Sequence, residues 1–94
     1  MRHVRWSDSA IRDLAELKNE LSEIHPDVAK TVLVRIAKAV RWLAEHPKAR
    51  PATGYRDWRK WVVPRTSRVI VYRPEPSGIV VLMVRHAHSD WNRP

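Results

Sequence analysis

Residues 68–84 read RVIVYRPEPSGIVVLMV, and this stretch decides the fold. It contains two apolar runs rich in β-branched residues, 68–72 and 79–84, separated by the turn-forming segment 74–78. Both runs are apolar at successive as well as alternate positions, which is typical of strands that are covered on both faces. The stretch therefore predicts two adjacent strands near the centre of a sheet.

A third strand is expected immediately before these two. Residues 58–63 are rich in aromatic and β-branched side chains, and residues 64–67 read PRTS, a turn. Three strands joined by tight turns form an antiparallel meander. Residues 47–54, PKARPATG, have the composition of a loop that leads into it.

The first half of the chain has helical periodicity instead. After the N-cap residue Ser7, apolar side chains recur every three or four positions, which predicts a helix over residues 8–24. A second helix begins at Pro26 and ends just before Pro47. The short connection between them makes the two helices an antiparallel hairpin. Residues 3–6 precede it as a short extended segment.

The predicted fold class is therefore α+β, with the order β-α-α-β-β-β in a single domain spanning residues 1–94. The helical hairpin packs on an antiparallel sheet and covers only one of its faces. The other face then needs local side chains, or a partner, to cover it.

Val34 and Trp42 fall outside the apolar arc of the second helix and lie among its cations. Two interpretations are open. Each side chain could pack against a lysine stem or the end of the first helix, or the two could form an exposed apolar patch that a partner covers.

Composition excludes several classes of protein. The 94 residues carry a net charge of +8, which favours an anionic partner, either nucleic acid or an acidic protein. Cysteine is absent, which excludes disulfides and thiolate zinc sites, and the two glycines cannot form a glycine-rich phosphate loop. No apolar run is long enough to span a membrane and no secretory signal is visible, so we expect a cytoplasmic protein.

Several segments, taken in order, resemble a known family. The opening strand ends in Trp6-Ser7, the second helix ends in LAEHP at residues 43–47, and VIVYR follows at residues 69–73. Residues 84–91, VRHAHSDW, are the most specific part. Together they resemble the RelE/ParE superfamily of type II toxin–antitoxin toxins, and the ParE-like branch in particular. Ser89 stands where this ending usually carries arginine, and Arg68 where an aromatic residue often stands.

The resemblance implies one of two activities. RelE-like members are ribosome-dependent mRNA endonucleases, which need an acid–base group and cations on the phosphate but no metal. His86 is the candidate acid–base residue, and Arg68 and Arg85 are the candidate phosphate ligands. His86 and His88 could chelate a metal, but no third ligand stands at a convincing spacing, so we expect neither a metal nor a cofactor.

ParE-like members poison DNA gyrase and need no catalytic residues. We favour this function, in which a surface recognises a protein target; tryptophan and arginine are frequent at such interfaces. The candidate target contacts are Arg59, Arg65, Tyr72, His86, His88 and Trp91. The resemblance also implies an acidic antitoxin, encoded alongside and bound in a hetero-oligomer. Val34 and Trp42, which lie among the cations of the second helix, are its candidate contacts.

A third possibility is a nucleic-acid-binding module without catalytic activity. The net charge favours it, as does the alternation of aromatic and basic residues at Trp58-Arg59-Lys60-Trp61. Trp58 and Trp61 have opposite parity in a strand, so at most one could stack on a base at a given face.

Overall fold

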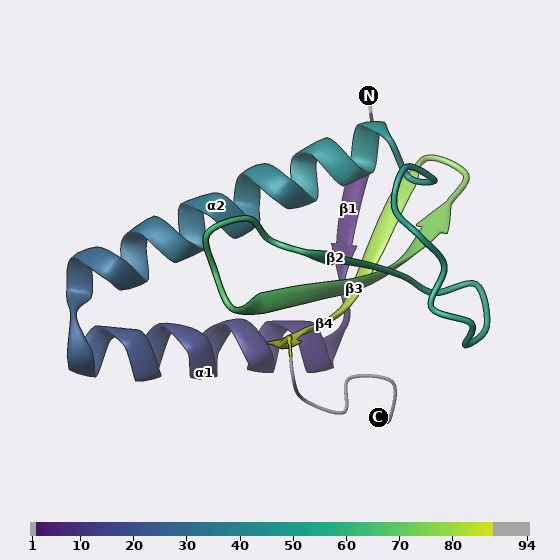
Figure 1. The fold of residues 1–94 in the computed structure, drawn as a ribbon. Coiled ribbons are helices and arrows are strands. Elements are labelled where there is room, and N and C mark those ends of the chain that lie inside the picture. The colour runs from purple at the N-terminus through teal and green to yellow at the C-terminus, as the bar shows by residue number, and fades with distance from the viewer. Residues whose placement is uncertain (1, 88–94) are drawn as a thin grey trace.

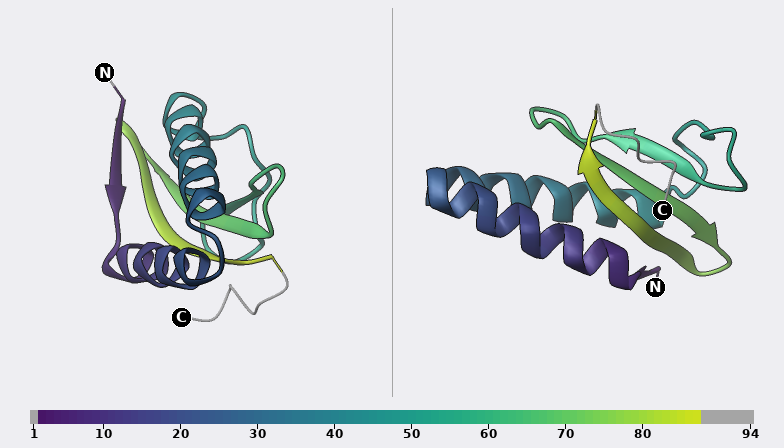
Figure 2. Two further views of the ribbon diagram at one scale, coloured as in Figure 1. Left: turned by 90° about the vertical axis from the view of Figure 1, so that its left-hand side faces the viewer. Right: turned by 90° about the horizontal axis from the view of Figure 1, so that it is seen from below.

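The computed structural model describes residues 2–87 and contains six elements in the predicted order. Two helices, α1 (Asp8–Ile24) and α2 (Pro26–Glu45), follow the first strand, β1 (His3–Trp6). Three strands then complete the sheet: β2 (Arg59–Val62), β3 (Arg68–Glu75) and β4 (Gly78–His86). The helices form an antiparallel pair on one side of the sheet (Figures 1 and 2). The predicted α+β fold with a helical hairpin is therefore confirmed.

The sheet is mixed, which differs from the expected antiparallel sheet. Its order is β1-β4-β3-β2, and the meander of β2, β3 and β4 is antiparallel as predicted. The opening strand β1, however, pairs with β4 in parallel, with His3 opposite Gly78 and Trp6 opposite Val81. Parallel partners need a long crossover, and here the crossover includes both helices and the first two strands of the meander.

The start of α1 is attached to β4 by a serine. The Ser7 side chain caps the helix by accepting a hydrogen bond from the Ala10 amide at 3.0 Å, and it donates to the Leu82 carbonyl at 2.8 Å. The Ser7 amide donates to the Val81 carbonyl at 2.9 Å. Leu82 is the extra residue of a β-bulge, because Tyr72 pairs with Val81 while Val71 pairs with Met83. One residue thus stops β1, starts α1 and satisfies the bulged strand.

The main core lies between the helices and the sheet. Its largest fully buried side chains include Leu17 from α1, Ile36 and Leu43 from α2, and Ile70 and Tyr72 from β3. Apolar burial of this kind stabilises the fold by about 25 cal/mol for each Å² removed from water. No described helix is long and apolar enough to span a membrane.

On the opposite face of the sheet, the two central strands are covered. Val69, Val71, Val80 and Met83 alternate with the core residues along β3 and β4, and all four are buried. The apolar positions of β3 and β4 are therefore covered on both faces, as the sequence of 68–84 predicted, whereas Val62 of β2, which pairs with Val69 on this face, is 50% exposed. The two central strands therefore offer no bare apolar face for docking, and the exposed large apolar side chains of the described residues lie on the two helices and on β2.

Candidate functional site

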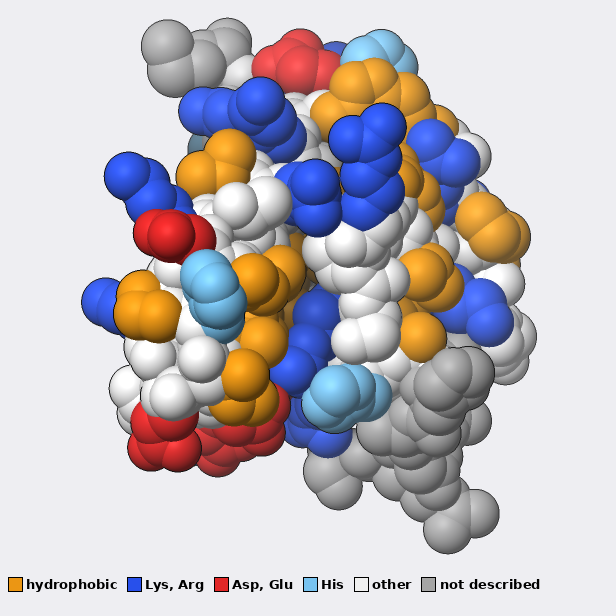
Figure 3. Space-filling model, turned by 60° about the vertical axis from the view of Figure 1, so that its left-hand side comes forward, with side chains coloured by type: hydrophobic (Ala, Val, Ile, Leu, Met, Phe, Trp, Pro, Cys, Tyr) orange, Lys and Arg blue, Asp and Glu red, His pale blue; other side chains and the backbone are white. Residues whose placement is uncertain are grey.

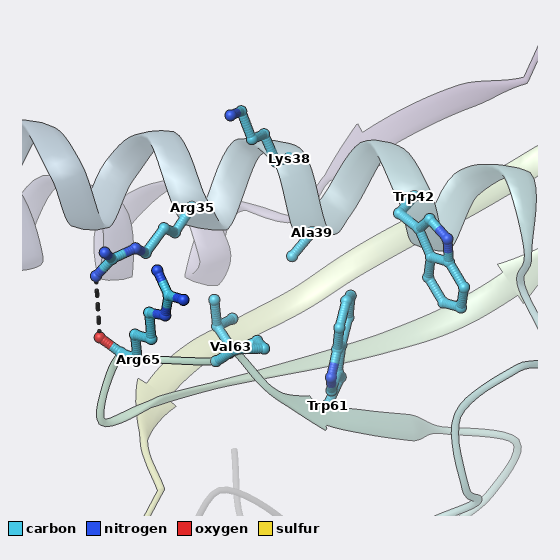
Figure 4. A pocket seen from close by; sticks show the side chains of 8 residues that line it. Arg35, Lys38, Ala39, Trp42, Trp61, Val63 and Arg65 are labelled. Atoms are coloured by element: carbon cyan, nitrogen blue, oxygen red, sulfur yellow. Dashed lines mark hydrogen bonds between the residues drawn. The ribbon is translucent and has the colours of Figure 1, made fainter.

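A groove of about 430 Å³ runs between α2 and the β2 strand with its following turn. Ala39 and Val63 form its apolar floor, and Trp42 and Trp61 face each other at one end (Figure 4). The two indole rings are 5.4 Å apart between centroids and tilted by 53°. The tryptophans close this end of the groove, and apolar side chains dominate its surface.

Three cations line the groove: Arg35 and Lys38 from α2, and Arg65 from the turn, with Arg35 and Arg65 at the end away from the tryptophans (Figure 4). Arg35 donates a hydrogen bond to the main-chain carbonyl of Arg65 at 3.2 Å, which ties the turn to the helix (Figure 4). Arg65 has a φ of 62°, a left-handed conformation that costs a residue other than glycine about 1 kcal/mol. Residues with backbone strain of this kind cluster at ligand-binding and catalytic sites.

Two smaller hollows continue this surface across α2. One of about 360 Å³ lies between α1 and α2, and one of about 340 Å³ lies along α2, and Lys30 and Val34 line both. Arg35 and Lys38 line the second hollow as well as the groove. The exposed fractions of Val34 and Trp42 are 45% and 37%. The two residues predicted to contact the antitoxin thus lie on one continuous surface.

Most of the positive charge of the protein comes from the part of the chain that includes α2, β2 and the turn after it. Residues 26–67 contain ten lysines and arginines but only three acidic residues, whereas α1 contains two basic and five acidic residues. Basic side chains gather around a hollow on the face shown in Figure 3, next to apolar side chains. Such a surface fits a partner that offers apolar side chains flanked by carboxylates.

The three candidate catalytic residues lie around one separate cavity of about 140 Å³. Carboxylates of α1, however, pair with both arginines. The buried Arg68 donates to Glu20 at 3.2 Å, and Arg85 donates to Asp13 at 2.8 Å. Asp13 also accepts the Val84 amide at 2.9 Å, beyond the point where β1 ends. These pairs attach α1 to the sheet and leave little free positive charge for a phosphate.

Comparison with known proteins agrees with this architecture. A family model described as "ParE toxin of type II toxin-antitoxin system, parDE" matches residues 4–91. The chain belongs to this family. A protein of Sinorhizobium fredii (strain NBRC 101917 / NGR234) named "Putative toxin Y4kP" is 32% identical over 90 residues, which cover 96% of this chain and 93% of that protein.

A solved structure has the same fold as this ParE-family chain. It is titled "Chromosomal ParDE TA system from P. aeruginosa" and superposes with a TM-score of 0.77. The match covers 92% of this chain and 96% of that one, at 19% sequence identity. The similarity therefore supports the order and packing of the elements.

The candidate target contacts of this ParE-family chain are dispersed. Arg65 lies at the groove, and the exposed His86 lies at the end of β4. Arg59 donates to the Arg50 carbonyl at 2.6 Å and so holds its own loop. Tyr72 is fully buried, and its hydroxyl donates to the Pro47 carbonyl at 3.0 Å. Its ring therefore packs in the core and is not exposed to a target.

The remaining two candidates, His88 and Trp91, lie outside the described residues. The sequence analysis also missed two residues that line the cavity beside His86. It did not select Asp13 and Glu20, although the acidic residues at 13, 16 and 20 recur at helical spacing and so form one stripe on α1. That spacing was the available signal for an acidic contact with the sheet.

Replacing Tyr72 by Phe is expected to change the response of the fold to alkali. Burial raises the pKa of the Tyr72 phenol above its ordinary value of 10.0, and the nearby Arg59 and Arg50 only partly offset this. The neutral phenol therefore stabilises the fold fully below pH 10, and this stabilisation is lost as pH rises through the folded-state pKa.

Tyr72→Phe also loses the hydrogen bond to Pro47, at a cost of about 1 kcal/mol near neutral pH. Urea unfolding from pH 8 to pH 11 should show the gap between the two proteins narrowing as pH rises. Tyr55→Phe serves as the control, because Tyr55 lies in the loop and is only half-buried. A constant gap across this range would contradict the proposed role of the phenol.

Proposed function

We propose that this ParE-family toxin acts in the cytoplasm by poisoning DNA gyrase, and that an acidic antitoxin neutralises it by binding the surface of α2 and the groove. The observation that carries this proposal is the pairing of Arg68 and Arg85 with carboxylates of α1. It argues against a phosphate-binding catalytic centre at the cavity beside His86. A protein-binding surface is then the more direct source of toxicity.

Two assays on the purified protein test the target. One measures supercoiling by DNA gyrase, and the other measures cleavage of mRNA on the ribosome. We expect inhibition of supercoiling with intact mRNA. Cleaved mRNA with unaffected supercoiling would favour the RelE-like endonuclease, with His86, Arg68 and Arg85 as its catalytic set. Binding of nucleic acid with neither effect would favour the non-catalytic module.

Salt should act mainly on the encounter between toxin and antitoxin. The cations around the groove attract an acidic chain over long range, whereas the apolar contacts determine how long the complex lasts. Raising the salt concentration from about 50 to about 300 mM is expected to slow association about tenfold and to change dissociation less than about twofold. Rates measured for the product of the adjoining gene check this. An association rate that does not depend on salt would contradict the electrostatic part of the proposal.

A further inference from the structure

Arg50 contacts both of the indole rings that close one end of the groove, although it does not line the groove itself. Its guanidinium carbon is 4.9 Å from the centre of the Trp42 ring and 4.2 Å from that of Trp61. Its Nε atom is buried and has no hydrogen-bond partner among the described residues. The guanidinium is thus held mainly by the faces of the two rings, which attract a cation.

Hydrogen bonds from the sheet fix the backbone of Arg50 and of its loop. Its carbonyl accepts a hydrogen bond from Arg59 of β2 at 2.6 Å, and the buried Tyr72 holds Pro47 at the start of the same loop. Trp42 is in turn stacked on His46, with 4.4 Å between the ring centroids and 20° between the ring planes. The guanidinium therefore has a fixed position from which it can orient both indoles.

A buried donor without an acceptor destabilises a fold, so the buried Nε of Arg50 calls for an explanation. Arg50 does not line the groove, whereas Trp42 and Trp61 do. Of the cations that do line it, Arg35 and Arg65 lie at the end away from the indoles (Figure 4). An effect of Arg50 on a molecule in the groove would therefore pass through the orientation of the indoles.

We propose that Arg50 is a positioning residue for antitoxin binding. It holds Trp42 and Trp61 as the end wall of the groove, so that the apolar surface is already in place when the antitoxin arrives. Rigid, preformed contact surfaces bind more tightly because less conformational entropy is lost on binding. The inference rests on the proposed binding of an acidic antitoxin at this groove.

The test compares Arg50→Met with Arg41→Met, using the antitoxin encoded by the adjoining gene. Both variants lose one positive charge, but Arg41 is an exposed residue of α2 that does not line the groove. We expect both to slow association slightly and to the same extent. Only Arg50→Met should dissociate faster, by about tenfold, the effect of losing about 1.4 kcal/mol of binding free energy. Its near-ultraviolet circular dichroism should also change in the free toxin, because the indoles are reoriented.

Equal dissociation rates for the two variants would overturn the proposal, whatever the spectrum of the free toxin shows. If Arg50→Met fails to fold by far-ultraviolet circular dichroism, Arg50→Lys decides. This variant keeps the charge but loses the planar group that stacks on the rings, so it should still dissociate several-fold faster than the parent. A parental dissociation rate for Arg50→Lys would overturn the proposal. If the unaltered toxin does not bind the antitoxin, the proposed function fails first.

Discussion

The Gly78→Ala variant is expected to lose about 3 kcal/mol of unfolding free energy, a large share of the stability of a small domain. A Cβ on Gly78 would lie 1.8 Å from the carbonyl oxygen of His3 and 2.8 Å from its carbonyl carbon. Both are backbone atoms of β1, so no flexible side chain can move aside. The variant can fold only by separating β1 from β4.

Urea unfolding measures this loss, and Gly54→Ala is the matched control. Gly54 has a φ of +85°, and no atom lies within 4 Å of the position that a Cβ would take, so the alanine adds backbone strain without a clash. That strain costs about 1 kcal/mol. Similar losses in the two variants would show that β1 does not depend on the close approach at Gly78.

The Trp42→Ala variant is expected to release the antitoxin at least about thirtyfold faster, which corresponds to about 2 kcal/mol of binding free energy. Trp42 is partly exposed at the groove and is the common member of three contacts, with His46, Trp61 and Arg50. Its removal would take away both apolar area and the end wall. Association should change little, because the charge of the toxin is unaltered.

Dissociation rates measured for Trp42→Ala and for Val28→Ala check this expectation. Val28 is also an exposed apolar residue of α2, with 45% of its surface accessible, but it lies outside the groove and both hollows. Thermal unfolding confirms that each variant is folded. A parental dissociation rate for Trp42→Ala would show that Trp42 packs only within its own chain.

The helices and the meander could be predicted because their signals are local. The recurrence of apolar residues predicts α1 with the observed bounds, and Pro26 and Pro47 delimit α2 to within a residue or two. The apolar runs of β3 and β4 likewise report burial on both faces. β3 continues through Pro74 to Glu75, further than its apolar run, because Glu75 pairs with Gly78 and leaves only two residues in the turn.

The parallel pairing of β1 and the roles of the arginines could not be predicted in this way. Nothing in residues 3–6 specifies which strand they join, because the register depends on the space that Gly78 leaves. Arg68 and Arg85 look like phosphate ligands in the sequence, but their partners stand 48 and 72 positions away on α1. Part of the site on α2 could be predicted from the sequence, since Val34 and Trp42 depart from the apolar arc. The groove also needs Trp61 and Arg65, which only the tertiary fold brings there.

The pairing of β1 with β4 has a consequence for the biosynthesis of the toxin. His3 is translated 75 positions before Gly78, its partner in the sheet, so the sheet is complete only when β4 has left the ribosome. Since synthesis proceeds at about 5–20 residues per second, several seconds pass between the translation of β1 and that of β4. The nascent chain should therefore be harmless until β4 emerges, and an antitoxin that binds the folded α2 surface would encounter each toxin molecule as it becomes active.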